Sequence, residues 1–255
     1  MVEWPHFNLS EFDLLENIRI ILVNTSHPGN IGSTARAMKT MGLSELYLVS
    51  PKLFPHVTAT ELSAGAEDIL EKATIVQSIP EAIKGCHCVI GTSARVREIS
   101  LPIQNPRECG QQVMQMAMNN NPVAIIFGRE QTGLTNDEIL HCHQQVFIPT
   151  NPDYRALNLA SAVQVICYEI RMALQEENPN FDRPECELAE AYEVELLYQQ
   201  MEETLIQLDF LNPKNPRRLM PRLRRLFNRI HLEKMEVNIL RGIIASIKNL
   251  TSKES

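Results

Sequence analysis

The sequence lacks any long uninterrupted run of apolar residues. None of its stretches approaches the roughly 20 consecutive apolar residues that span a bilayer. The first residues, MVEWPHFNLSEFD, are too acidic and hold too short an apolar run to be typical of a signal peptide. We therefore expect no membrane partner and a cytoplasmic location.

Cysteines at the spacing of a metal or disulfide framework are also missing. The six cysteines are dispersed over a chain far longer than the small secreted domains that depend on disulfides. Two clusters of Cys and His occur, at residues 86–88 (CHC) and 141–143 (HCH), but neither has the two-residue gap that is usual between zinc-ligating cysteines. We expect reduced thiols, solvated histidines and no structural metal.

An overall excess of positive charge is absent, because 31 acidic side chains against 24 Lys and Arg give a formal net charge of −7. Binding to nucleic acid depends on local rather than total positive charge. Residues 185–209 hold eight acidic side chains and no Lys or Arg, whereas residues 213–232 hold seven Lys or Arg and no acid. This separation leaves a basic segment available for a nucleic-acid partner.

Short apolar runs alternate with helical stretches from residue 18 to about residue 175. This alternation predicts an α/β domain with a largely parallel sheet and helices on both faces. Buried parallel strands are typically short runs of this kind, which here are Ile18–Val23, Leu46–Val49, Cys88–Gly91, Val123–Phe127 and Val146–Ile148. A long helix over Leu157–Leu174 is expected to close the domain, since apolar residues recur there at spacings of three and four.

The rest of the chain predicts a linker and a small helical domain. The segment EENPNFDRP, residues 176–184, has no apolar periodicity and is typical of a linker. Three apolar stripes at helical spacing follow, one of which consists of Leu219, Leu223, Phe227 and Ile230. The expected organisation is one domain over residues 1–175, a linker over 176–184 and a helical extension over 185–255.

Four expected strands are followed by loops with glycine, hydroxyl or charged residues, which is where parallel sheets bind ligands. These loops are NTSHPGNIGSTAR (24–36), GTSARVR (91–97), FGREQTGL (127–134) and the segment from Ile148-Pro149 to LNLA (157–160). Each loop taken singly could be a structural turn. None has the GxGxxG or P-loop pattern, which disfavours an ordinary dinucleotide-binding enzyme. Together the loops predict one ligand site at the carboxyl edge of the sheet.

In their order, these motifs resemble those of the SpoU-like RNA 2′-O-methyltransferases of the SPOUT class. The resemblance covers roughly residues 17–170 and rests on Asn30-x-Gly32-x-x-x-Arg36, Phe127-Gly128-x-Glu130-x-x-Gly133-Leu134, and Ile148-Pro149 with Leu157-Asn158-Leu159. It implies a C-terminal trefoil knot, S-adenosyl-L-methionine as methyl donor and a homodimer. The runs LRRLFNR (223–229) and NILRG (238–242) narrow the resemblance to members that methylate the ribose of nucleotide 32 in the tRNA anticodon loop.

By motif position, the resemblance also assigns roles to single residues. Arg36 and Asn30 are expected in the catalytic site, and Arg97 as a second functional arginine that also contacts RNA. Glu130 is a candidate catalytic carboxylate, with the alternative that it holds a loop through backbone N–H groups. The residues expected to line the cofactor pocket are Thr92, Ser93, Ala94, Gly128, Ile148, Arg155, Ala156, Leu157 and Asn158. Many relatives have Ser where this chain has Ala156, so a role for that hydroxyl is excluded.

The basic segment of the helical extension is the expected tRNA contact. If its apolar stripe faces inward, the arginines between the apolar positions lie outside that stripe. These expected RNA-binding residues are Arg217, Arg218, Arg224, Arg225 and Arg229. The alternative is that they pair with the acidic residues of the preceding helix.

The sequence is also compatible with two other functions. A non-catalytic RNA-binding protein could keep the same fold, but the retained Arg36 favours an enzyme. Methylation of rRNA rather than tRNA is the alternative within the same family, and the helical extension favours tRNA.

Overall fold

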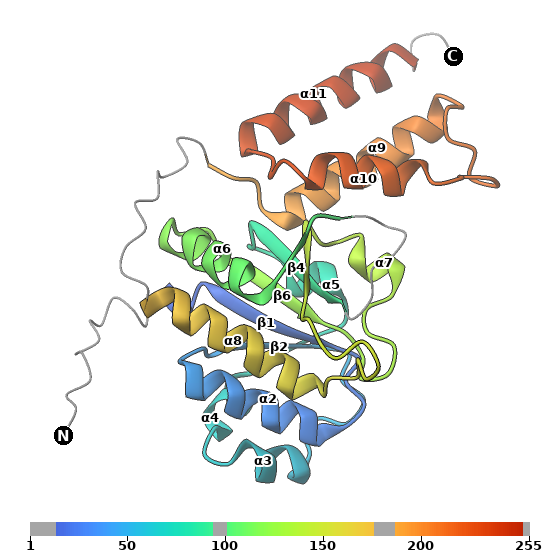
Figure 1. Ribbon diagram of the computed structural model, residues 1–255. Helices are drawn as coiled ribbons and strands as arrows, with labels where there is room; N and C mark the ends of the chain where they lie inside the picture. The colour runs from blue at the N-terminus through green and yellow to red at the C-terminus, as the bar shows by residue number, and fades with distance from the viewer. Residues whose placement is uncertain (1–13, 94–100, 176–186, 252–255) are drawn as a thin grey trace.

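The computed structural model describes residues 14–93, 101–175 and 187–251. Its centre is a parallel sheet in the strand order β3-β2-β1-β6-β4-β7-β5 (Figure 1). The strands are β1 (Ile18–Val23), β2 (Glu45–Val49), β3 (Thr74–Val76), β4 (Cys88–Ser93), β5 (Ile103–Gln104), β6 (Val123–Phe127) and β7 (Gln144–Phe147). Because all of them run in the same direction, their carboxyl ends meet at one edge of the sheet.

The five strands expected from the sequence are present, and β1 and β6 have the expected bounds. The sequence did not predict β3 or β5. Both are short and partly exposed, with Ile75 and Ile103 each 48% exposed, so neither forms the uninterrupted apolar run that marks a buried strand.

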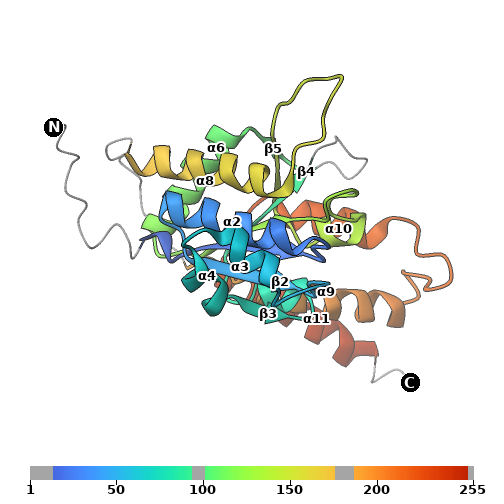
Figure 2. The same cartoon turned by 90° about the horizontal axis from the view of Figure 1, so that it is seen from below.

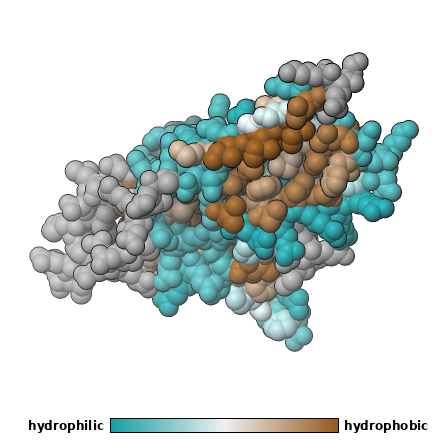
Figure 3. Space-filling view, turned by 90° about the horizontal axis from the view of Figure 1, so that it is seen from above, coloured by the Kyte–Doolittle hydropathy of each residue, from teal (hydrophilic) through white to brown (hydrophobic). Residues whose placement is uncertain are grey.

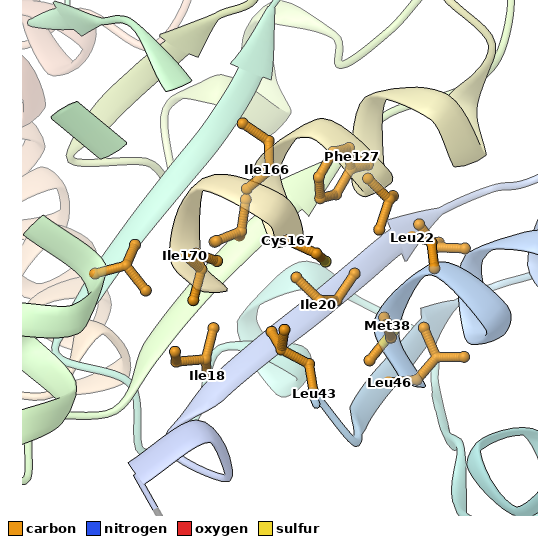
Figure 4. Packing of buried hydrophobic residues seen from close by; sticks show 14 of the residues in the cluster. Ile18, Ile20, Leu22, Met38, Leu43, Leu46, Phe127, Ile166, Cys167 and Ile170 are labelled. Atoms are coloured by element: carbon orange, nitrogen blue, oxygen red, sulfur yellow. The ribbon is translucent and has the colours of Figure 1, made fainter. Parts of the chain in front are cut away.

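Helices cover both faces of the sheet. One face packs against α2 (Pro28–Met41), α6 (Pro106–Met118) and α8 (Leu159–Gln175) (Figure 1). Figure 4 shows Ile20 and Leu22 of β1 among Met38, Ile166 and Ile170 of these helices. Each such side chain stabilises the fold by roughly 1.5–3 kcal/mol when fully buried.

The shorter helices complete the layers. α3 (Val57–Ser63) and α4 (Glu67–Lys72) pack on α2, on the side shown at the bottom of Figure 1. The opposite face of the sheet packs against α5 (Ile79–Ala82) and α7 (Asn136–Ile139). Within the described part of the chain, no helix is long and apolar enough to cross a membrane.

Helix α2 carries the first motif, and its ends are set by local chemistry. His27 precedes the helix and its Nδ1 accepts a hydrogen bond from Gly29 N at 3.2 Å, while Pro28 occupies the first turn. The helix ends at Gly42, whose φ of 87° lies in the left-handed region that glycine adopts without strain. These caps fix the direction in which the first motif leaves the sheet.

The chain after residue 186 is helical, with α9 (Ala191–Gln207), α10 (Leu219–Asn228) and α11 (Lys234–Thr251) around a core that contains Leu197, Tyr198 and Val237. Three helices are present where three apolar stripes were expected, but α11 packs through Val237 and Ile244 rather than through the expected stripe that includes Met235, Ile239 and Ile243. The expectation that Ile230 faces inward is wrong, because α10 ends at Asn228 and Ile230 is 59% exposed. The expected linker, residues 176–184, falls outside the described residues, and the domain boundaries stay a prediction.

Apolar side chains also gather on an outer face of this helical region. Met235, Ile239 and Ile243 of α11 recur every four residues and are each more than half exposed. Figure 3 shows the corresponding apolar surface from above.

The helical region contacts the sheet domain through polar groups. Asn228 Nδ2 donates to Cys142 O at 2.8 Å, and Ala191 N donates to Cys86 O at 2.5 Å. The ring of His231 stacks on that of His143 at a centroid distance of 5.4 Å. The expectation of solvated histidines is therefore wrong for His143, which is buried; that burial lowers its pKa to about 3. The described cysteines are free and buried.

Candidate active site

A cavity of about 450 Å³ lies where β4, β6 and β7 end and the chain leads into α8. Figure 2 shows that the chain before α8 stands out from the body of the molecule as a long loop. The walls combine the hydroxyls of Thr92 and Ser93 with the apolar side chains of Val146, Ile148 and Leu157. A cavity of this size and mixed lining fits a small organic ligand.

Most residues expected in the cofactor pocket lie on this cavity. Its lining includes Thr92, Ser93, Gly128, Ile148, Arg155, Ala156 and Leu157. Asn158 does not line it but lies next in the chain. Ala94 and Arg97 lie outside the described residues. The cavity is also lined by Arg129, Thr132 and Thr150, which were not predicted from the sequence as cofactor-binding residues.

The second motif forms a tight turn against the cavity. Arg129 and Gly133 exchange two backbone hydrogen bonds, of 3.2 and 2.9 Å. A Cβ at Gly128 would lie only 2.1 Å from Gly133 C, so any larger residue there would push the two arms of the turn apart. An ion pair of 2.9 Å between Arg129 Nη1 and Glu138 Oε2 connects the start of this turn to α7.

Glu130 in this turn ties the second motif to the first. Its carboxylate accepts hydrogen bonds from Ser26 N at 3.1 Å, Ser26 Oγ at 2.9 Å, His27 N at 3.1 Å and Asn30 Nδ2 at 3.0 Å. Burial on its own raises the pKa of Glu130, but the backbone N–H groups and the Asn30 amide outweigh it and lower the pKa to about 2. Glu130 is therefore ionised at neutral pH, with its oxygens occupied by donors.

Asn30 extends the connection to the third motif. Its Oδ1 accepts a hydrogen bond of 3.0 Å from Asn158 Nδ2. Asn158 Oδ1 accepts in turn from Ala160 N at 2.9 Å, at the start of α8. The chain Glu130–Asn30–Asn158 thus joins the loops after β1, β6 and β7 beside the cavity.

Arg36 occupies a different position. It is exposed on α2, about 9 Å beyond Asn30 along the helix axis at 1.5 Å per residue, and it does not line the cavity. Among the residues that the structure describes, Arg36 has no hydrogen-bond or ion-pair partner. Its guanidinium is thus available to a group from outside the described residues.

The expected RNA-binding arginines in and beside α10 divide into two groups. Arg224 Nη1 and Nη2 donate to Glu195 of α9 at 2.5 and 2.6 Å, and its guanidinium lies 4.6 Å from the centre of the Tyr198 ring. The expectation that Arg224 belongs to an open basic surface is therefore wrong, and pairing with the preceding helix holds for this residue. Arg217, Arg218, Arg225 and Arg229 have exposed side chains.

Comparison with known families covers almost the whole described chain. Residues 17–168 match the model of the SpoU rRNA Methylase family. Residues 192–255 match the model described as tRNA methyltransferase TrmJ, C-terminal domain.

Individual relatives resemble the chain over nearly its full length. It is 50% identical to tRNA (cytidine/uridine-2′-O-)-methyltransferase TrmJ of Pectobacterium atrosepticum, covering 92% of this chain and 98% of that one. It is 48% identical to tRNA (cytidine/uridine/adenosine-2′-O-)-methyltransferase TrmJ of Pseudomonas aeruginosa, covering 93% and 96%. The crystal structure of TrmJ from Z. mobilis ZM4 superposes with a TM-score of 0.80 at 28% identity, covering 90% and 98%.

Proposed function

The chain belongs to the SpoU methylase family and carries the TrmJ C-terminal domain. From this membership we propose that it transfers a methyl group from S-adenosyl-L-methionine to a ribose 2′-oxygen of tRNA in the cytoplasm. The proposed acceptor is cytidine or uridine at nucleotide 32 of the anticodon loop. Relatives that are 50% and 48% identical to this chain are named for methylation of cytidine and uridine in tRNA.

The observation that carries this proposal is the junction at Asn30. One amide side chain bonds to both Glu130 and Asn158, so three motifs from distant parts of the chain meet beside a single cavity. Catalysis by positioning requires such mutual bracing of the loops that hold the reactants.

The cavity suits S-adenosyl-L-methionine. Its volume of about 450 Å³ is within the range of small-molecule pockets. The apolar residues Val146, Ile148 and Leu157 can enclose a flat adenine ring. The hydroxyl of Thr92 donates to Ile126 O at 3.1 Å, and its oxygen can still accept a hydrogen bond from the polar parts of the cofactor. When bound, the cofactor supplies an electrophilic methyl group on a positively charged sulfur.

The remaining chemistry concerns the ribose oxygen. A 2′-hydroxyl becomes a good nucleophile only as its proton leaves, so the site must stabilise negative charge on that oxygen. Arg36 suits this role, because a guanidinium is permanently charged and can bridge a phosphate and the oxygen. Use of Arg36 as a base would need help from the substrate phosphate, because a guanidinium keeps its proton in proteins.

Glu130 fits a supporting role better than proton transfer. Four donors already occupy its oxygens, and its pKa of about 2 makes it a weak base at neutral pH. We assign it to holding the first motif in place.

A homodimer accounts for the position of Arg36. Since Arg36 is exposed and does not line the cavity of its own chain, the proposed dimer brings it beside the cofactor of the partner subunit. Twofold dimers are also the commonest oligomers. Analytical ultracentrifugation tests this arrangement, and the expected mass is about twice the chain mass of 29.0 kDa.

The helical region is proposed to hold the body of the tRNA. Arg217, Arg218, Arg225 and Arg229 are exposed and suited to phosphate contacts, whereas Arg224 is bound to Glu195. Arg97 is proposed to contact the RNA near the reacting ribose.

Mapping of ribose methylation in tRNA from cells with and without the gene tests the proposal. Loss of methylation at nucleotide 32, restored by the wild-type gene and not by an Arg36→Ala copy, is the expected result. Intact tRNA methylation together with a missing methyl group in rRNA would instead favour the rRNA alternative.

A further inference from the structure

Tyr154 is the most exposed of the large apolar and aromatic side chains that the structure describes, at 74%. It belongs to the loop between β7 and α8, and the next three residues in the chain, Arg155, Ala156 and Leu157, line the cavity. An aromatic ring is thus held in solvent beside the wall of the proposed cofactor site.

The loop fixes the backbone that carries this ring. Asn151 Oδ1 accepts from Asp153 N at 3.0 Å, and Asn151 O accepts from Tyr154 N at 3.0 Å. Arg155 Nε donates to Pro152 O at 3.1 Å. These bonds form a compact turn of the kind that an asparagine side chain stabilises. The exposed Tyr154 is therefore carried by a hydrogen-bonded turn.

We propose that Tyr154 stacks on the base of the nucleotide that is methylated and thereby positions its ribose. The inference rests on the proposed function and names a substrate contact within it. A ribose whose 2′-oxygen reaches into the cavity must leave its base outside, next to the cavity wall. RNA-binding proteins commonly hold such splayed bases on aromatic side chains.

Stacking also suits an acceptor that is either cytidine or uridine. These bases differ in the hydrogen-bonding groups of their Watson–Crick edges, but both present a flat face. Contact with that face is tolerant of sequence, because every base has one. Tyr154 would therefore hold either base without reading its edge.

Steady-state methyl transfer by the full-length Tyr154→Ala, Tyr154→Phe and wild-type proteins tests the proposal. Removal of the ring is expected to lower kcat/KM for tRNA roughly 5- to 150-fold, the range found for loss of one stacked base. Tyr154→Phe keeps the ring and should stay close to the wild type. Tyr168→Ala, which removes a tyrosine 48% exposed on α8, is the matched control and should also stay close to it.

An RNA substrate that lacks the base but keeps the 2′-hydroxyl at the acceptor position identifies the partner of the ring. The wild type should lose about as much on this substrate as Tyr154→Ala loses on intact tRNA, and Tyr154→Ala should lose little more. Losses that multiply in this cycle would overturn the proposal, because the ring and the base would then act independently.

Two further measurements separate the alternatives. Calorimetry should give the same affinity for S-adenosyl-L-methionine in the wild type and Tyr154→Ala. A loss of cofactor affinity as large as the loss of kcat/KM in Tyr154→Ala would place the ring on the cofactor instead. The wild-type rate on intact tRNA, from the same series, tests the proposed function separately from the role of Tyr154.

Discussion

The side-chain amide of Asn30 donates a hydrogen bond of 3.0 Å to Glu130 Oε1, although the two residues are separated by 100 positions in the chain. This bond connects the start of α2 to the turn after β6. The same amide group accepts from Asn158, so Asn30 bonds to a side chain of each of the other two motifs.

Replacement of this side chain should impair methyl transfer without unfolding the protein. In Asn30→Ala both hydrogen bonds are lost and the loops can shift relative to the cavity, and a displacement of about 1 Å at a reacting centre costs on the order of 10²-fold in rate. Radiolabelled methyl transfer and circular dichroism measure the two properties. Ser33→Ala, on the same helix, is the control, and an Asn30→Ala protein with the wild-type rate would show that the bracing is dispensable.

Arg36→Ala should abolish most of the activity while leaving the cofactor affinity nearly unchanged. Its guanidinium is assigned to the reacting oxygen and does not line the cavity, and removal of one such charge-stabilising group costs roughly 10²- to 10³-fold in rate. Isothermal titration with S-adenosyl-L-methionine and a methyl-transfer assay separate binding from catalysis.

The same variant tests the shared site of the proposed dimer. Mixing Arg36→Ala with Asn158→Ala chains should form dimers in which one of the two sites has both wild-type residues, because Arg36 and Asn158 come from different subunits there. Partial recovery of activity on mixing is expected. Mixtures no more active than the separate variants would place Arg36 in the site of its own chain.

Loss of the Arg224–Glu195 pair should destabilise the fold. The two side chains are only 14% and 9% exposed, and Arg224→Ala leaves a buried carboxylate with His141 but without its guanidinium partner, which costs about 3 kcal/mol. Arg225→Ala, one residue further along and exposed, should change the stability by less than about 0.5 kcal/mol. Thermal unfolding of both variants decides between a structural and a surface role for Arg224.

The stability that this pair contributes has a defined pH dependence. Burial raises the pKa of Glu195, but the hydrogen bonds from Arg224 and the nearby His141 ring, 3.3 Å away, outweigh it and lower the pKa from its ordinary value of 4.5 to about 2. A carboxyl with a depressed pKa stabilises the fold above its unfolded pKa, and the contribution is lost as the pH falls. The gap in Tm between the wild type and Arg224→Ala should therefore be largest above about pH 4.5 and should shrink from there towards pH 2.

The exposed arginines should control the salt dependence of tRNA binding. Arg225→Glu with Arg229→Glu removes two proposed phosphate contacts, and each lost contact lowers the slope of log K against log salt by somewhat under one unit. Filter binding at several salt concentrations gives the slope. A doubly substituted protein with the wild-type slope would remove this face from the tRNA contact surface.

The sequence predicted those parts of the fold that depend on local pattern. β1 and β6 are uninterrupted apolar runs, so their bounds were predicted to the residue. The common location of the motif loops followed from the parallel direction of the strands. β3 and β5 were missed because two or three partly exposed residues give no distinctive pattern.

The connections within the site depend on tertiary structure and could not be predicted in the same way. The bond between Asn30 and Asn158 joins residues 128 positions apart and exists only once the strands are in register. The burial of Arg224 was missed for a related reason, because helical periodicity identifies the apolar stripe but not which polar residue a neighbouring helix will pair with. The trefoil knot expected from the resemblance to SpoU-like enzymes stays a prediction.

Methyl transfer to the 2′-oxygen of nucleotide 32 is the reaction proposed for this protein. The most direct measurement is incubation of the purified protein and labelled S-adenosyl-L-methionine with two versions of one tRNA, which differ only in carrying a ribose or a 2′-deoxyribose at that nucleotide, followed by nucleotide mapping. One methyl group on the ribose of nucleotide 32, and none on the deoxy version, is the predicted result. Equal labelling of both versions, or a methyl group on a base, would contradict the account.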